Sequence, residues 1–130
     1  MNRIRVGTFQ VGSTVKREQG LRIAVTRRPP RGIPRKNWTP AYFDVWLPSL
    51  APSNALLSWA HKAGLQDPER RKRFFQRYQR EVLGRAESRQ TIDLLKKMAR
   101  RVPVSIGCHC ADENMCHRSH LLKLILKQSL

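Results

Sequence analysis

The sequence predicts an α/β domain with a small, mainly parallel sheet, from three segments that follow one another near its C-terminal end. The middle segment, "VPVSIGCHC" at 102–110, is rich in β-branched residues and contains no Lys, Arg, Asp or Glu, which is typical of a buried strand. Helices are expected before it, over Glu87–Arg101, and after it, over "RSHLLKLILKQ". This order indicates a parallel central strand covered by helices in a three-layer-like domain.

The length of 130 residues indicates one domain, spanning 1–130, with one hydrophobic core. Apolar residues make up 40% of the chain, which favours a folded protein over a disordered one. We expect about four to five helices around the sheet, from the helical periodicity of the segments between the strands.

Two earlier segments are predicted to be strands. "RIRVGTFQV" at 3–11 alternates basic and apolar residues, and "LRIAVTR" covers Leu21–Arg27. The second strand is followed by "RPPRGIPRKN", in which three prolines and a glycine exclude regular structure. This is the most basic irregular segment of the chain. The candidate ligand-binding residues are Arg27, directly before it, and Arg31, Arg35 and Lys36 within it.

The helices between these strands and the last one have clear end signals. Ser53 occupies an N-cap position ahead of "NALLSWAHKAG", and Gly64 is a suitable C-terminal cap. A further helix is expected to begin near Asp67-Pro68 and to run to Gly84. The spacing of its apolar stripe predicts core positions at Phe74, Tyr78 and Val82. Helical spacing also predicts a short helical piece that contains Tyr42, Phe43, Trp46 and Leu47.

The charge balance favours a polyanionic partner. Lys and Arg total 26 against nine Asp and Glu, so the formal net charge is +17. Such a field attracts nucleic acid or a small anionic ligand. A ridge of arginines opposite the apolar stripe is a candidate phosphate-tracking surface, and a solvated helix face is the alternative. The ridge consists of Arg70, Arg73, Arg77 and Arg80.

Location and redox state are also expectations from the sequence. No apolar run approaches the about 20 residues of a membrane span, and the first residues lack an apolar secretory core, so we expect a cytoplasmic protein without membrane contact. The chain has three cysteines, which in a reducing compartment argues for free thiols or metal ligation over structural disulfides. The sequence does not indicate an oligomeric state.

Four stretches together resemble one protein family. They are "LRIAVTRRPPRGIPRKNW", "DVWLPSLAPSNALLSWAH", "FFQRYQREV" and "IGCHCADENMCHRSHL". In order and approximate spacing they are similar to domain of unknown function family 488, the YeaO-like small α/β proteins. The resemblance covers nearly the whole chain and implies a site, although no reaction. The family-like positions are Arg27, Arg31, Gly32, Leu50–Ser53, Cys110, Cys116, His117 and Arg118.

The segment "GCHCADENMCHRSH", Gly107 to His120, contains all three cysteines. Cys108 and Cys110 share one face of a strand, while Cys116 and His120 are four apart on the expected helix. A tetrahedral zinc set of these residues is therefore conceivable. Its spacing, C-x-C-x5-C-x3-H, is not a common zinc-finger spacing, so no cofactor is favoured and zinc remains the alternative.

A reactive thiol is the other interpretation of the segment. Cys116 precedes the last helix, whose N-terminal dipole stabilises a thiolate. The phosphatase-loop spacing Cys-x5-Arg is absent, because the arginine position holds Cys116 when counted from Cys110 and Leu122 when counted from Cys116. In a purely structural alternative, the cysteines are small buried side chains and Arg118 pairs with an acidic neighbour. The candidate catalytic residues are Cys110, Cys116, His117 and Arg118.

The function predicted from these observations is a Cys-His-Arg pocket at the carboxyl edge of the sheet. If the strand that ends at Arg27 runs parallel to the strand that ends at Cys110, the loops after both strands meet at this edge. Arginine side chains and free helix N–H groups suit a phosphate-bearing ligand such as a nucleotide or nucleic acid. Whether the protein is an enzyme stays open. The alternatives are a non-catalytic nucleic-acid-binding protein and a structural zinc protein.

Overall fold

A sheet of four parallel strands, in the order β1-β4-β2-β3, forms the centre of the computed structural model. The structure describes residues 4–28, 34–37, 42–110, 112 and 115–127. The strands are β1 (Val6–Gln10), β2 (Leu21–Ala24), β3 (Val45–Trp46) and β4 (Val104–Cys108). β4 pairs with β1 on one side and with β2 on the other, and every one of its residues is buried. The predicted α/β class and the parallel central strand are confirmed.

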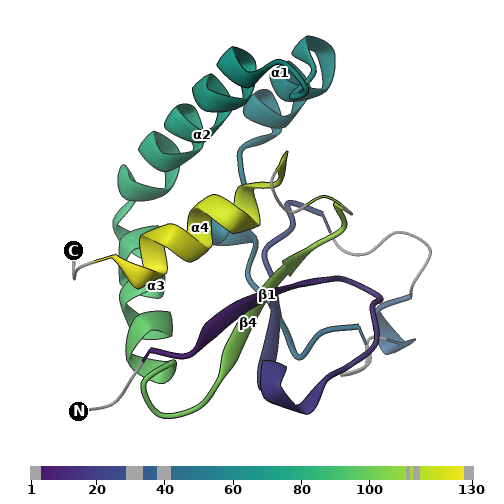
Figure 1. Cartoon of the computed structure of the whole chain (residues 1–130), viewed down its shortest axis with the longest axis vertical. Coiled ribbons are helices and arrows are strands. Elements are labelled where there is room, and N and C mark those ends of the chain that lie inside the picture. The colour runs from purple at the N-terminus through teal and green to yellow at the C-terminus, as the bar shows by residue number, and fades with distance from the viewer. Residues whose placement is uncertain (1–3, 29–33, 38–41, 111, 113–114, 128–130) are drawn as a thin grey trace.

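Four α-helices pack on one face of this sheet (Figure 1). They are α1 (Asn54–Ala63), α2 (Pro68–Leu83), α3 (Ala86–Met98) and α4 (His117–Leu126). Within the described residues three short 3-10 turns accompany them: η1 (Arg17–Gln19), η2 (Arg35–Asn37) and η3 (Pro48–Leu50). Each α-helix contributes buried side chains to one core, together with Ile23 and Val25 at β2 and with Val104 and Ile106 of β4. Among the described helices none is both long and apolar enough to span a bilayer.

In the part of the chain that the structure describes, aromatic side chains cover the opposite face of the sheet. Phe9, Ala24 and Phe43 form a second buried cluster there. The guanidinium carbon of Arg22, a fully buried side chain, lies 4.2 Å from the centre of the Phe9 ring. In the described residues the third layer expected from the sequence therefore consists of side chains and loop segments, since all four α-helices lie on the other face.

The helical piece predicted from Tyr42, Phe43, Trp46 and Leu47 is wrong. The described part of this segment forms β3 and then η3. Backbone pairing with β2 decides the outcome, because the Asp44 amide donates to the Arg22 carbonyl at 2.7 Å and the Leu47 amide donates to the Ala24 carbonyl at 2.8 Å. Pro48 also disfavours a helical backbone at the residue before it.

The predicted ends of α1 and α2 are confirmed, whereas the helix predicted over Glu87–Arg101 ends earlier, at Met98. The Ser53 hydroxyl accepts a hydrogen bond from the Leu56 amide, and Gly64 ends α1 with φ of 80°. Asp67 caps α2, and Pro68 is its first residue. The apolar stripe Phe74, Tyr78 and Val82 is buried, as expected.

Gly107 provides a test of the packing between β4 and the edge strand β1. A Cβ atom at this position would lie 2.4 to 2.6 Å from three carbons of the Phe9 ring. We expect Gly107→Ala to lower the free energy of unfolding by about 1 to 3 kcal/mol, because the buried ring has to move. Urea denaturation measures the loss.

The matched control is Gly7→Ala on β1. A Cβ atom at Gly7 meets only the Ser105 hydroxyl, at 3.6 Å, which is ordinary van der Waals contact. The loss for this variant is expected to stay below about 1 kcal/mol. Equal losses in the two variants would show that contact with Phe9 does not determine the cost.

Candidate functional site

The candidate site lies where β2 and β4 end, at the carboxyl edge of the sheet. The two strands are parallel neighbours, and the Val25 amide extends their pairing by a 2.8 Å hydrogen bond to the Gly107 carbonyl. The segments that follow, 26–28 and 109–110, therefore leave the sheet side by side. This confirms the parallel arrangement on which the predicted site depends.

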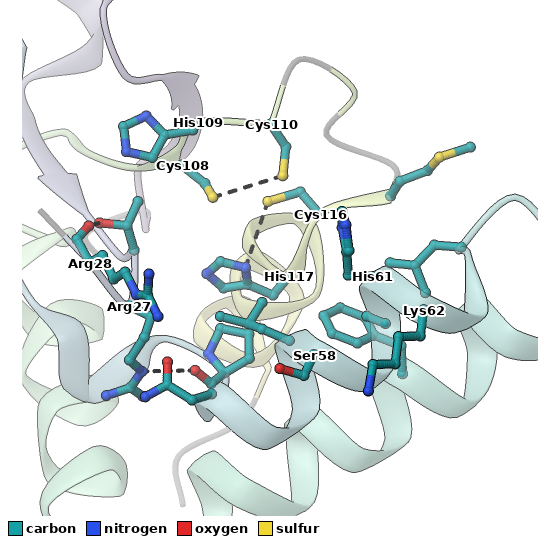
Figure 2. A pocket seen from close by; sticks show the side chains of 18 residues that line it. Arg27, Arg28, Ser58, His61, Lys62, Cys108, His109, Cys110, Cys116 and His117 are labelled. Atoms are coloured by element: carbon teal, nitrogen blue, oxygen red, sulfur yellow. Dashed lines mark hydrogen bonds between the residues drawn. The ribbon is translucent and has the colours of Figure 1, made fainter. Parts of the chain in front are cut away.

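Three free thiols converge at this edge: those of Cys108, Cys110 and Cys116. Their sulfur atoms all lie within 4.8 Å of one another, and the Cys108 and Cys110 sulfurs are 4.0 Å apart. The side chains point toward one another in Figure 2. Their exposure differs, because Cys108 is 7% exposed and Cys116 is 1% exposed, whereas Cys110 is an exposed residue.

His117 begins α4 and is fixed by a hydrogen bond to the end of β2. Its Nε2 lies 2.7 Å from the Val25 carbonyl oxygen. A carbonyl only accepts, so Nε2 carries the hydrogen and the neutral ring has an unprotonated Nδ1. This Nδ1 lies 3.7 Å from the Cys116 sulfur. Burial, against the hydrogen bond to Val25, lowers the pKa of His117 to about 4.

The cluster favours a thiolate on its exposed member. Hydrogen bonds from the thiols of Cys108 and Cys116 lower the pKa of Cys110 well below its ordinary value, with help from the nearby His117 and Arg118. The same hydrogen bonds raise the pKa of Cys108 and of Cys116, which keep their protons as donors. These shifts favour the negative charge of the cluster on the exposed sulfur of Cys110.

Arg118 acts on the backbone beside this thiol. It is only 4% exposed, and its Nη1 donates a 2.6 Å hydrogen bond to the carbonyl of Cys110. Its Nε is buried without a hydrogen-bond partner in the described part of the chain. Arg118 therefore holds the Cys110 segment in position.

A cavity of about 760 Å³ opens beside the thiols. Besides the cysteines and His117, its wall includes three basic side chains and two more histidines: Arg27, Arg28, Lys62, His61 and His109. In Figure 2 the arginines lie on one side of the sulfur cluster, and His61 and Lys62, from the last turn of α1, lie on the other. The cavity therefore combines an exposed sulfur with cationic side chains from separate elements.

Arg27 reaches the cavity wall, yet its guanidinium is engaged elsewhere. Its Nε donates to the Pro52 carbonyl and its Nη2 donates to the Ala51 carbonyl, both at 2.9 Å. It thus holds the turn at Leu50–Ser53 against β2. The structure places the other predicted ligand-binding residues differently: Arg35 and Lys36 are exposed on η2 and are not part of this cavity wall, while Arg31 lies outside the described residues.

The predicted zinc set of Cys108, Cys110, Cys116 and His120 is wrong in its histidine. His120 Nε2 lies 2.8 Å from the Gln79 side-chain oxygen, and its ring stacks on Phe75. The physical reason is that Cys116 is the N-cap, with extended φ and ψ of −106° and 145°, so the helical spacing of four does not apply to it. The three sulfurs alone are close enough to hold a metal ion.

The predicted arginine ridge on α2 is partly engaged within the chain. Arg70 donates to the Ala63 carbonyl at 2.6 Å and lies 3.6 Å from the Asp67 carboxylate. The guanidinium of Arg77 lies 5.1 Å from the centre of the Trp59 ring. Arg73 and Arg80 are exposed on the helix.

Sequence reasoning missed Arg28, His61 and Lys62 as cavity residues. Nothing near His61 and Lys62 in the sequence shows that the end of α1 approaches the thiols, because that approach depends on how α1 packs against α2 and the sheet. The only local signal is their position in the last turn before the Gly64 cap.

Comparison with known proteins identifies a family. The family model DUF488-N3a, described as "Active DUF488-N3 subclade", matches residues 6–129. The match bears out the resemblance seen in the sequence motifs. No curated protein and no solved structure matches the chain.

The buried His117 predicts a specific dependence of stability on pH. The folded chain keeps this ring neutral down to about pH 4, whereas the unfolded chain binds a proton near the ordinary value of 6.5. The unfolded state therefore takes up more protons in this window, and stability is lost as the pH falls from about 6.5 to about 4. The free energy of unfolding should fall by up to about 3 kcal/mol, measured by urea denaturation.

His117→Gln is the control for this measurement. Its side-chain amide can donate to the Val25 carbonyl but does not titrate. The variant should show a smaller loss of stability over the same pH window. An unchanged slope would mean that groups other than His117 cause the acid sensitivity.

Proposed function

We propose that this chain, which belongs to the DUF488 family, binds a phosphate-bearing ligand in the cavity beside the three thiols and that Cys110 acts on the ligand as a thiolate. The observation that carries the proposal is the common wall of the cavity. The exposed Cys110 sulfur shares this wall with the cationic side chains of Arg28 and Lys62.

The choice of Cys110 over the other thiols follows from access and hydrogen bonding. A thiolate, not a thiol, is the nucleophile, and a ligand has to reach it. Cys108 and Cys116 are buried and act as donors, while Cys110 is exposed and receives their hydrogen bonds. The buried cysteines therefore support the reacting one.

The choice of a phosphate-bearing ligand follows from charge and size. Arg28 and Lys62 are both exposed, and the formal net charge of +17 attracts anions to the whole molecule. A volume of about 760 Å³ is within the usual range for small-molecule sites and is sufficient for a nucleotide. A nucleotide, or the end of a nucleic acid, is the ligand class that fits these features.

Alkylation of the thiols by iodoacetamide tests the proposal. Cys110 should react about ten-fold or more faster than Cys108 and Cys116 at neutral pH, because it alone is both exposed and deprotonated. Pyrophosphate, the probe for the ligand, should slow this reaction about ten-fold at about ten times its Kd, because only the free site reacts. Peptide mass spectrometry identifies the modified cysteine.

Two single substitutions separate the cavity from general charge. Lys62→Ala should weaken the protection by pyrophosphate, whereas Lys72→Ala, an exposed lysine of α2 outside the cavity wall, should leave it unchanged. Chloride at equal ionic strength should give no protection. Equal effects of the two substitutions would contradict the proposal. Stoichiometric zinc together with three unreactive thiols, in protein purified without an affinity tag, would also contradict it and would favour the zinc alternative.

Nucleic-acid binding through α2 is the second candidate, supported by the exposure of Arg73 and Arg80. Affinity for a duplex oligonucleotide should fall steeply with salt, and the double substitution Arg73→Ala and Arg80→Ala should reduce the slope of log K against log salt by about 2. Fluorescence anisotropy measures both.

The matched control for this candidate removes two positive charges from another part of the surface. Lys97→Ala with Arg100→Ala replaces two exposed basic residues, one near the end of α3 and one just after it. Its salt slope should stay at the wild-type value. Equal slopes for the two double variants would assign the binding to net charge alone and exclude α2 as the interface.

A further inference from the structure

A single nucleophile requires one thiol, whereas this cluster has three. The geometry of the cluster suggests a role for Cys108. The Cys108 and Cys110 sulfurs are 4.0 Å apart, whereas a disulfide needs about 2.05 Å. β4 ends at Cys108, so the backbone at 109–110 is outside the strand pairing of the sheet. A movement of about 2 Å by the Cys110 side chain would bring the sulfurs to bonding distance.

The third thiol is held in a different way. Cys116 is the N-cap of α4, and its sulfur faces His117 Nδ1 at 3.7 Å. His117 is itself fixed to the Val25 carbonyl. Cys116 is also the most deeply buried of the three, at 1% exposed. Its place at the start of α4 and its burial therefore restrict its movement most, which leaves Cys108, at the end of β4, as the neighbour available to Cys110.

We propose that Cys110 and Cys108 form a redox pair in which a hydroperoxide oxidises Cys110 and Cys108 resolves the product to a disulfide. The inference rests on the exposed Cys110 of the proposed function but not on the phosphate-bearing ligand. Disulfide formation would reversibly stop the proposed action of Cys110 on its ligand, because a disulfide has no thiolate. It also protects Cys110 from irreversible oxidation to the sulfinic acid.

The two steps balance as follows. The Cys110 thiolate attacks one peroxide oxygen, so an S–O bond forms, the O–O bond breaks, and the leaving alkoxide or hydroxide takes a proton from water; the sulfur is oxidised by two electrons to a sulfenic acid. The Cys108 sulfur then attacks the Cys110 sulfur, the S–O bond breaks, and water leaves with the Cys108 proton. A dithiol reductant restores both thiols by exchange.

Intact-mass spectrometry of the full chain after one equivalent of hydrogen peroxide tests the pair. The wild type should lose about 2 Da, the mass of two hydrogens, and dithiothreitol should reverse the loss. Cys116→Ser should show the same loss. Cys108→Ser should instead accumulate a sulfenic acid on Cys110 that dimedone traps, and Cys108→Ala provides a second variant that adds no polar group at this buried position.

Three results would overturn the pair. They are a loss of about 2 Da in both Cys108 variants, a wild type that only gains oxygen, and a disulfide that joins two chains. The iodoacetamide experiment separates this failure from that of the proposed function. Fast alkylation of Cys110 without a disulfide to Cys108 removes the redox pair alone, whereas an unreactive Cys110 removes both proposals.

Discussion

The hydrogen bond between His117 Nε2 and the Val25 carbonyl is the constraint on which the arrangement of the site depends. It joins the first residue of α4 to the end of β2, across 92 positions of sequence. Because the carbonyl only accepts, the bond fixes the hydrogen on Nε2 and leaves Nδ1 as an acceptor beside Cys116. Cys116 is thereby held at the carboxyl edge of the sheet, with its sulfur within 4.8 Å of the sulfurs of Cys108 and Cys110.

Two of the family-like arginines donate hydrogen bonds to backbone carbonyls around this site. Arg27 donates to the carbonyls of Ala51 and Pro52, and Arg118 donates to the carbonyl of Cys110. Guanidinium groups suit such a task because they keep their charge when buried and offer several donors in a fixed geometry. Arg28 and Lys62 line the cavity without these bonds, so the residues that hold the scaffold differ from those to which we assign the proposed ligand.

Local physical chemistry explains which predictions succeeded. β4 was predictable because β-branched residues suit a strand buried on both faces, and the ends of α1 were predictable from the cap at Ser53 and the glycine that follows the helix. The segment around Trp46 was predicted as helix because its spacing fits one, but pairing with β2 overrides that spacing. The approach of Lys62 to the thiols depends on packing between distant elements, which no local pattern contains.

The thiols show how burial can reverse a prediction made from helix electrostatics. In the reactive-thiol interpretation of the sequence, Cys116 is a candidate thiolate, because a helix N-terminus stabilises negative charge by roughly 0.3 to 1 kcal/mol at an exposed position. In the folded chain Cys116 is buried and donates its proton, so burial and its neighbours raise its pKa instead. The negative charge moves to Cys110, where solvent and two donated hydrogen bonds stabilise it together. Proximity to a helix end therefore matters less here than access to water.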